Sequence, residues 1–330
     1  MDERTIDRGF GSILGALVGD AAGAYLEFLG RQPSADEVEK AMHMPGGGCW
    51  NVAPGQITDD GELMLCLAQA LFDGSEFDIE KHARLYARWY KSPPFDIGHT
   101  TAASIGCIGR SDSLSIIESE GFAAAMTKAA KRDCMGSKAN GSLMRAAPIG
   151  VWGYQKTDTE IARVAGLDSG LSHPHESCCQ AVVAYSIAIA ELVKTGNRTS
   201  AWARTKNWLQ ANANAELNDW AAVIESNEQV SGHPQAGFVR IAFIHAFQSL
   251  IANHDYQTAI RSVLSIGGDT DTNACIVGGL IGAATGAGNI PAVMCKAVIN
   301  CDTSEGRRPR PDFLRPGKVL PQIRSALASL

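Results

Sequence analysis

A run of small residues near the carboxyl end constrains the fold of this chain most. Residues 274–283 read ACIVGGLIGA and contain no charged side chain. A helix that is apolar on every side is buried, and its glycines let neighbouring helices approach closely. Asp269 and Asp271 stand directly before this run. Carboxylates at the mouth of a buried helix require partners, because an unpaired buried charge is costly.

Helical periodicity dominates the rest of the chain. Apolar residues recur at 3.6-residue spacing at 12–28, 63–71, 178–193 and 238–251. The alternating pattern of half-buried strands is missing, and turns such as PGGG and SPP separate the periodic segments. The sequence therefore predicts an all-α fold, with about a dozen helices packed on one another.

Composition excludes several classes of protein. Of the 330 residues, 45% are hydrophobic and 19% charged, and the net charge is -6. Basic residues cluster only in GRRPRP at 306–311, so nucleic acid is not expected as a partner. The amino terminus lacks the features of a signal peptide, and the apolar stretch at 274–287 is too short and too rich in glycine for a membrane span. We expect a cytoplasmic protein that does not bind membranes.

The nine cysteines form no CxxC pair and lie within helical patterns. Neither a disulfide framework nor a zinc site matches this spacing. We therefore interpret them as reduced residues of the core.

Two helix starts are rich in oxygen donors. The first carries Thr58, Asp59 and Asp60, and the second carries Asp269, Asp271 and Thr272. Each start taken alone is explained by helix capping: Asp59 with Glu62 resembles a capping box, and Thr270 or Asp271 is a suitable cap for the second helix. Together they offer four carboxylates and two hydroxyls, which are the donors that Mg²⁺, Mn²⁺ and Ca²⁺ prefer. If the two starts meet, they form a site for two ions roughly 3.5 to 4 Å apart.

This requirement favours a single domain over residues 1–330, because ligands more than 200 residues apart must share one core. Within it we expect a lead-in at 1–10 and a proline-containing tail with a helix at 303–330. The segment 196–232 is more polar and is expected at the periphery.

The first periodic segment adds two carboxylates, Asp20 and Glu27, seven residues apart and hence on one face of a helix. For Asp20 we expect a hydrogen bond to a nearby helix end. For Glu27 two interpretations stay open, a solvated residue at the end of the helix and a functional carboxylate.

Six motifs occur in order along the chain: GDAAGAYLE (19–27), TDD (58–60), DIGHTT (96–101), NGSLMR (140–145), SHP (172–174) and GGDTDT (267–272). Together they resemble the ADP-ribosylglycohydrolase family of the dinitrogenase reductase-activating glycohydrolase type. The resemblance implies an all-α, single-domain orthogonal bundle with a dinuclear Mg²⁺ or Mn²⁺ centre at the mouth of a central cleft. It also implies removal of ADP-ribose from modified protein side chains, with arginine as the first choice. Serine-linked or other O-linked ADP-ribose, or binding of ADP-ribose without catalysis, are the alternatives.

The resemblance also assigns roles to residues. The metal ligands would be Thr58, Asp59, Asp60, Asp269, Asp271 and Thr272. The proton acceptor would be Glu27 or a metal-bound carboxylate, such as Asp59 or Asp271. The substrate would contact Asp96 and Gly98 at the ribose, and Asn140, Gly141, Ser142 and His173 at the diphosphate.

At some positions, the roles that the resemblance implies stay open. Arg145 fits both a substrate-binding cation and a structural salt bridge, and His173 fits both a hydrogen-bond donor and a helix cap, with a weaker claim for His175. Lys138 stands where some relatives hold an aromatic residue that stacks on adenine, and His99 stands where the family often has asparagine.

Overall fold

The computed structural model describes residues 1–74 and 76–329 and is all-α, as the periodicity predicts. No strand occurs among the described residues, which contain only two isolated backbone bridges, Gly47 with Val52 and Ala139 with Phe238. The helices are α1 (Glu3–Gly23), α2 (Ala35–Met42), α3 (Asp59–Leu71), α4 (Ile79–Lys91), α5 (His99–Ser104), α6 (Ser111–Glu120), α7 (Phe122–Asp133), α8 (Ala147–Trp152), α9 (Asp158–Gly170), α10 (Glu176–Thr195), α11 (Arg198–Asn212), α12 (Ala215–Ser226), α13 (Val239–Ile251), α14 (Tyr256–Ser265), α15 (Thr270–Thr285), α16 (Ala292–Ile299) and α17 (Pro316–Ser329).

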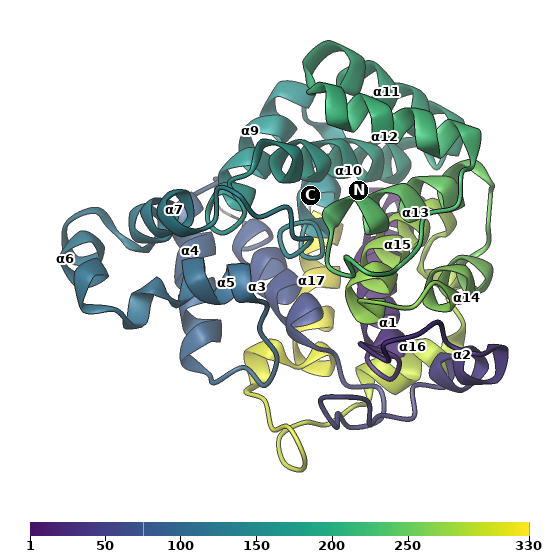
Figure 1. Ribbon diagram of the computed structural model, residues 1–330, viewed down its shortest axis with the longest axis horizontal. Helices are drawn as coiled ribbons and strands as arrows, with labels where there is room; N and C mark the ends of the chain where they lie inside the picture. Colours follow the sequence, from purple (N-terminus) through teal and green to yellow (C-terminus); the bar gives the residue numbers. More distant parts are fainter. Residues whose placement is uncertain (75, 330) are drawn as a thin grey trace.

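The centre of the molecule is the pair α1 and α15, which lie side by side in Figure 1. Gly11, Gly15, Gly19 and Gly23 recur every fourth residue along one face of α1. A Cβ atom on any of them would collide with the backbone of α15 or of the turn after it. The two backbones therefore pack in direct contact, which brings the carboxyl end of α1 beside the amino end of α15. The small-residue run has the role that its sequence suggests.

Helix α10 forms a second part of the core. It is long and apolar enough to cross a membrane by length and composition, yet 78% of its most apolar window is buried inside the protein. Tyr185 donates a hydrogen bond from its hydroxyl to the Ile276 carbonyl of α15 at 2.8 Å. These contacts are those of a core helix in a helical bundle.

The first helix differs from its predicted bounds. It begins at Glu3, capped by Asp2, so most of the expected lead-in at 1–10 is helical. It ends at Gly23 rather than at residue 28. The chain then turns, because Phe28 takes a left-handed backbone conformation (φ 53°) and donates its N–H to the Gly268 carbonyl at 3.1 Å. Glu27 therefore lies in a turn beside α15 and not on the helical face of Asp20.

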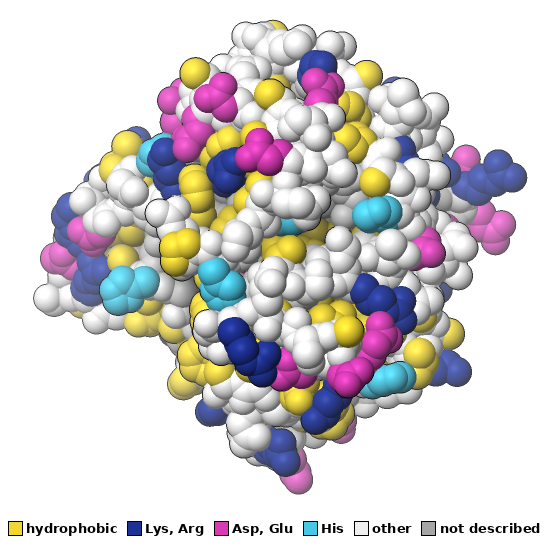
Figure 2. All heavy atoms as spheres, turned by 45° about the vertical axis from the view of Figure 1, so that its right-hand side comes forward, with side chains coloured by type: hydrophobic (Ala, Val, Ile, Leu, Met, Phe, Trp, Pro, Cys, Tyr) yellow, Lys and Arg dark blue, Asp and Glu magenta, His cyan; other side chains and the backbone are white. Residues whose placement is uncertain are grey.

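Other expectations have mixed outcomes. The segment 196–232 folds into α11 and α12 at the edge of the molecule (Figure 1), in agreement with its polarity. The tail from residue 303 ends in α17. All nine cysteines are free thiols and five are buried, but Cys49 is exposed, so the assignment of every cysteine to the core was wrong. Figure 2 shows Lys and Arg interspersed with Asp and Glu on one face, without a continuous basic patch there.

Candidate active site

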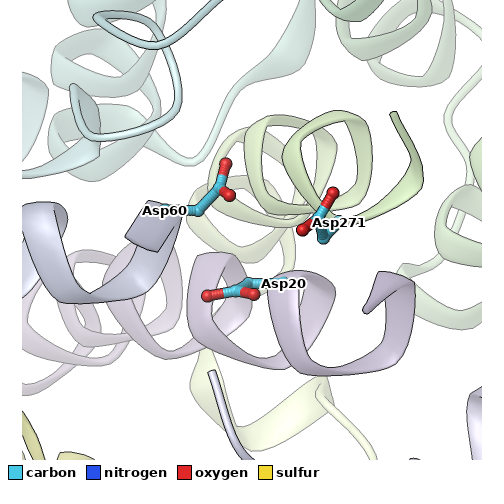
Figure 3. A group of neighbouring side chains, drawn as sticks. All are labelled: Asp20, Asp60 and Asp271. Carbon is cyan, nitrogen blue, oxygen red and sulfur yellow. The ribbon is translucent and has the colours of Figure 1, made fainter. Parts of the chain in front are cut away.

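Three helix ends bring carboxylates together. Asp20 lies in the last turn of α1, Asp60 in the first turn of α3 and Asp271 in the first turn of α15, and Figure 3 shows the three side chains together where these helices meet. Each offers an oxygen within 4.8 Å of the others. Asp271 also belongs to a second group with Glu27 and Asp96 that meets the same distance limit. The predicted meeting of the two acidic helix starts is therefore present.

Helix capping does not explain these acids. The N-cap residues of α3 and α15, Thr58 and Asp269, make no capping hydrogen bond through their side chains. Glu62 does not close a capping box, since its carboxylate is bound to Arg310 (Nε–Oε1 2.6 Å) and to the indole of Trp89 (2.7 Å). The Thr270 hydroxyl, the other suggested cap, donates to the Gly23 carbonyl at 2.7 Å.

Asp20 performs the capping of α3 from a different helix. Its carboxylate accepts hydrogen bonds from the backbone N–H groups of Thr58 (3.0 Å) and Gly61 (2.9 Å). The Thr58 hydroxyl lies 2.8 Å from Asp20 and 3.0 Å from Asp60. The expected bond between Asp20 and a helix end is thus confirmed, and the acids of α3 are left for another role.

The electrostatics of the cluster call for positive charge. Burial, followed by repulsion between neighbouring carboxylates, raises the pKa of Asp59, Asp60 and Asp271 well above the usual range. Burial, then Asp271 and Asp96, raises the pKa of Glu27 to about 11. The Oδ1 atom of Asp60 is buried and has no hydrogen-bond partner among the described residues. A buried, unpartnered carboxylate oxygen within an all-oxygen donor set fits a hard divalent cation.

These residues line a cavity of about 360 Å³. Of the residues predicted for the site, the cavity is lined by Glu27, Asp59, Asp60, Asp96, Gly98, Asn140, Gly141, His173, Asp269, Asp271 and Thr272. Thr58 and Ser142 are fully buried and do not line it. No Lys or Arg occurs among its described lining residues. A larger surface hollow of about 750 Å³ beside the start of α1 contains none of the predicted residues.

The residues of segment 140–142 differ in their contacts. The Asn140 side chain donates to Asp269 Oδ2 at 2.8 Å, so it orients a candidate metal ligand. The Ser142 hydroxyl accepts a hydrogen bond from Ser169 at 2.9 Å and faces the core. The backbone N–H groups of Gly141 and Ser142 have no acceptor among the described residues. Two free N–H groups in a turn suit an anionic oxygen.

Arg145 is a structural residue. It is fully buried, its Nε donates to Asp168 Oδ2 at 3.0 Å, and its guanidinium lies 4.7 Å from the centre of the Tyr86 ring. Arg145 and the other partners hold the pKa of Asp168 below its usual range although burial alone would raise it. The salt-bridge interpretation of Arg145 is therefore the correct one.

Arg145 also acts on His173 through Ser172. Its Nη1 donates to the Ser172 hydroxyl at 2.9 Å, and that oxygen lies 2.8 Å from His173 Nδ1. Burial, then the Arg145 charge, lowers the pKa of His173 to about 3, so the imidazole is neutral near pH 7. Because the Ser172 oxygen already accepts from Arg145, we assign its own hydrogen to Nδ1, the tautomer that leaves the ring hydrogen on Nε2. His173 lines the cavity as a neutral N–H donor.

The structure also places the other residues that the sequence singles out. His175, not His173, caps α10, since its Nδ1 accepts from the Ser177 N–H at 3.1 Å. Lys138 pairs with Glu216 of α12 at 2.9 Å. His99 is exposed at the start of α5 and lines the cavity.

Comparison with known proteins agrees with this geometry. The sequence model of the ADP-ribosylglycohydrolase family matches residues 1–313. The chain belongs to this family. A protein of Acanthamoeba polyphaga mimivirus is 28% identical over 316 residues, covering 89% of this chain and 91% of its own. The ADP-ribosyl-[dinitrogen reductase] glycohydrolase of Rhodospirillum rubrum is 26% identical, with 87% and 88% covered. The resemblance found in the sequence is confirmed.

Two further comparisons are more limited. An ADP-ribosylarginine hydrolase of Pseudomonas putida is 38% identical over 106 residues, which are 30% of this chain and 27% of that protein. A solved structure described as an ADP-ribosylglycohydrolase-related protein complex has a TM-score of 0.73 at 23% identity and covers 98% of this chain and 100% of its own. That likeness establishes the all-α fold of the family.

Sequence reasoning missed residues that surround Glu27. Trp50 donates its indole N–H to Glu27 Oε2 at 2.7 Å, and the Cys49 thiol lies 3.4 Å from the same oxygen. Phe28 lines the cavity with 57% of its surface exposed. Cys49 and Trp50 follow three glycines in a loop without periodicity, so no sequence pattern connects them with Glu27.

Proposed function

We propose that this chain is a divalent-metal-dependent hydrolase that removes ADP-ribose from arginine side chains of modified proteins. The observation that carries the proposal is the convergence of Asp60, Asp271 and their neighbours at one cavity in a member of this family. The names of the relatives from Rhodospirillum and Pseudomonas support a protein-linked ADP-ribose, and the latter specifies arginine.

The proposed metal ligands are the oxygens of Thr58, Asp59, Asp60, Asp269, Asp271 and Thr272, for about two Mg²⁺ or Mn²⁺ ions. When bound, such ions neutralise the carboxylates and polarise an oxygen bound to them. Asn140 orients Asp269 for this role through its 2.8 Å hydrogen bond. Asp20 holds the amino end of α3, and with it Asp59 and Asp60, against α1.

The reaction consumes one water. The C1″–N bond of the modified arginine breaks, the oxygen of water bonds to C1″ and gives up one proton, and the leaving guanidine nitrogen takes up one proton. In our proposal Glu27 accepts the proton of the attacking water, because it lines the cavity beside Asp96 and Asp271 and is held by Trp50. Burial is the largest cause of the raised pKa of Glu27, and repulsion from Asp271 and Asp96 comes next. Compensation of that negative charge returns Glu27 toward its ionised, basic form.

The diphosphate would bind at the other side of the cavity. In the tautomer that we assign, His173 presents a neutral Nε2–H, and Gly141 offers a backbone N–H without an acceptor, whereas Ser142 does not line the cavity. A Cβ atom on Gly141 would lie 2.8 Å from His173 Cε1, so glycine is needed for this close packing. Contacts remote from the bond that breaks position the reacting carbon at the carboxylates.

Incubation of the protein with arginine-ADP-ribosylated and serine-ADP-ribosylated peptides, with Mg²⁺ or with EDTA, tests the proposal. We expect release of ADP-ribose from the arginine-linked peptide only when Mg²⁺ is present. Preferential cleavage of the serine-linked peptide would replace the N-glycosidic assignment by an O-glycosidic one. Tight binding of ADP-ribose without cleavage of either peptide would identify a non-catalytic ADP-ribose-binding protein.

The histidine pair provides a second prediction. We expect His173→Ala to weaken ADP-ribose binding by about 1 to 3 kcal/mol, the cost of losing a hydrogen bond to a charged group, while metal binding is retained. His175→Ala removes the cap of α10 and should lower stability without changing ADP-ribose affinity. Isothermal titration of both variants with ADP-ribose measures the difference. Equal affinities for the two variants would show that His173 does not contact the diphosphate.

A further inference from the structure

The basic cluster in the tail is built into the protein beside the site. Its last member, Arg310, is buried, donates to both carboxylate oxygens of Glu62 (2.6 and 2.8 Å), and reaches the carbonyl oxygens of Ser92 and Pro93 (2.8 and 2.9 Å). Charge-assisted, bidentate pairs of this kind fix both position and orientation. We call residues 306–310 the arginine strap, and Arg310 anchors it to α3.

The middle of the arginine strap holds the loop that carries Trp50. Arg308 donates its Nε–H to the Trp50 carbonyl at 2.8 Å, and its guanidinium lies 5.6 Å from the centre of the Phe95 ring. Its own carbonyl accepts from Gln56 Nε2 at 2.8 Å. Arg307 adds a hydrogen bond to the Asn51 side chain at 3.0 Å. The arginine strap therefore contacts both the Trp50 loop and the residue that precedes Asp96.

The opposite end of Trp50 holds Glu27. The indole N–H bond to Glu27 Oε2, at 2.7 Å, is shorter than the contact from Cys49. Glu27 lies in a turn beyond the end of α1, so the helix itself does not set its orientation. The Trp50 loop is closed by two backbone hydrogen bonds between Gly47 and Val52, at 2.8 and 3.0 Å. Because these bonds hold the loop in one conformation, we expect a shift of the Trp50 carbonyl to move the Trp50 indole as well.

We propose that Arg308 is a positioning residue for Glu27, acting through the Trp50 carbonyl on one side of the loop and the Trp50 indole on the other. The expected effect on kcat rests on the proposed function. The expected effect on the position of the Trp50 loop and of Glu27 rests on geometry alone. Loss of Arg308 leaves the ligands of the proposed metal site and the diphosphate contacts in place. It therefore lowers the rate of the chemical step and not the affinity for the ADP-ribose part.

The kinetic test is a double-mutant cycle with Trp50→Phe and Arg308→Gln. Trp50→Phe keeps an aromatic side chain and removes the N–H. We expect it to lower kcat by about tenfold to a hundredfold, because misplacement of a catalytic group is that costly. Arg308→Gln should also lower kcat, and its KM should stay within about twofold of the wild-type value. The double variant should have the same kcat as Trp50→Phe alone. Arg308→Lys, which keeps one donor, should recover part of the rate. Arg4→Gln removes the same charge from the exposed first turn of α1 and should leave kcat unchanged.

A second measurement is independent of turnover. Cys49 is the exposed cysteine of the chain and shares Glu27 with Trp50. Its rate of alkylation by iodoacetamide, followed by mass spectrometry, should rise several-fold in Arg308→Gln and not in Arg4→Gln, because a shift of the loop releases the thiol from its 3.4 Å contact with Glu27. An alkylation rate of Cys49 in Arg308→Gln equal to that of the wild-type protein would overturn the positioning role of Arg308. Additive losses of kcat in the double-mutant cycle would overturn it as well. Absence of peptide cleavage by the wild-type protein would instead refute the proposed function, and the alkylation result would still decide the role of Arg308.

Discussion

Asp271→Asn should abolish cleavage of the arginine-linked peptide while preserving the helical fold. Asp271 is the residue that belongs to both carboxylate groups. Asparagine keeps the shape and loses the charge that a divalent ion requires. Since metal-bound charge supplies several kcal/mol and about 1.4 kcal/mol is a tenfold change in rate, we expect a loss of about 10³-fold in kcat. Asp59→Asn should have a similar effect.

The control for this substitution is Asp255→Asn. Asp255 caps α14 by accepting from the Thr258 N–H at 2.7 Å, and asparagine caps equally well. Asp271, in contrast, is in the first turn of α15 and is not its N-cap residue, although its Oδ1 accepts from the Thr272 N–H at 2.9 Å. Circular dichroism, melting temperature and kcat should be close to wild type for Asp255→Asn. Near wild-type turnover of Asp271→Asn and Asp59→Asn would reduce these aspartates to structural residues.

The parts of the fold that the sequence predicts are those governed by local periodicity. The start of α3 at Asp59 and of α15 at Thr270 follow from oxygen-bearing residues placed before apolar runs. The close packing of α1 on α15 follows from small residues, and Asp20 of α1 in turn binds the start of α3, so that the acidic motifs of α3 and α15 meet. For these features the local sequence pattern and the tertiary structure agree, so one sequence is sufficient to predict them.

The parts that the sequence does not predict depend on partners distant in the chain. Glu62 stands three residues after Asp59, which suggests a capping box, but its carboxylate binds Arg310, 248 positions away. The periodic segment continues through residue 28, but α1 ends at Gly23 because the following turn packs on Gly268. Neither competing contact leaves a local pattern. Both errors fall beside the site, where tertiary contacts override the helical signal.

Metal-linked stability is the other large effect that we expect. Burial and mutual repulsion raise the pKa of Asp60 and Asp271 above the unfolded value. A carboxyl group with a raised folded pKa favours the fold below its unfolded pKa, and that contribution is lost as the pH rises through the folded pKa. The metal-free protein should therefore become less stable from about pH 4 upward through these groups.

Addition of Mg²⁺ or Mn²⁺ should reverse this trend, because the ions bind the ionised carboxylates and displace their protons. At a metal concentration of about 100 Kd, one site contributes about 2.7 kcal/mol to stability. The difference in melting temperature between metal-loaded and EDTA-treated protein should therefore be larger at about pH 8 than at about pH 5.5. The Asp271→Asn variant should lose most of this difference, and Asp255→Asn should keep it. A melting temperature that is insensitive to metal at both values, together with no heat on titration of the chelated protein, would eliminate the metal site.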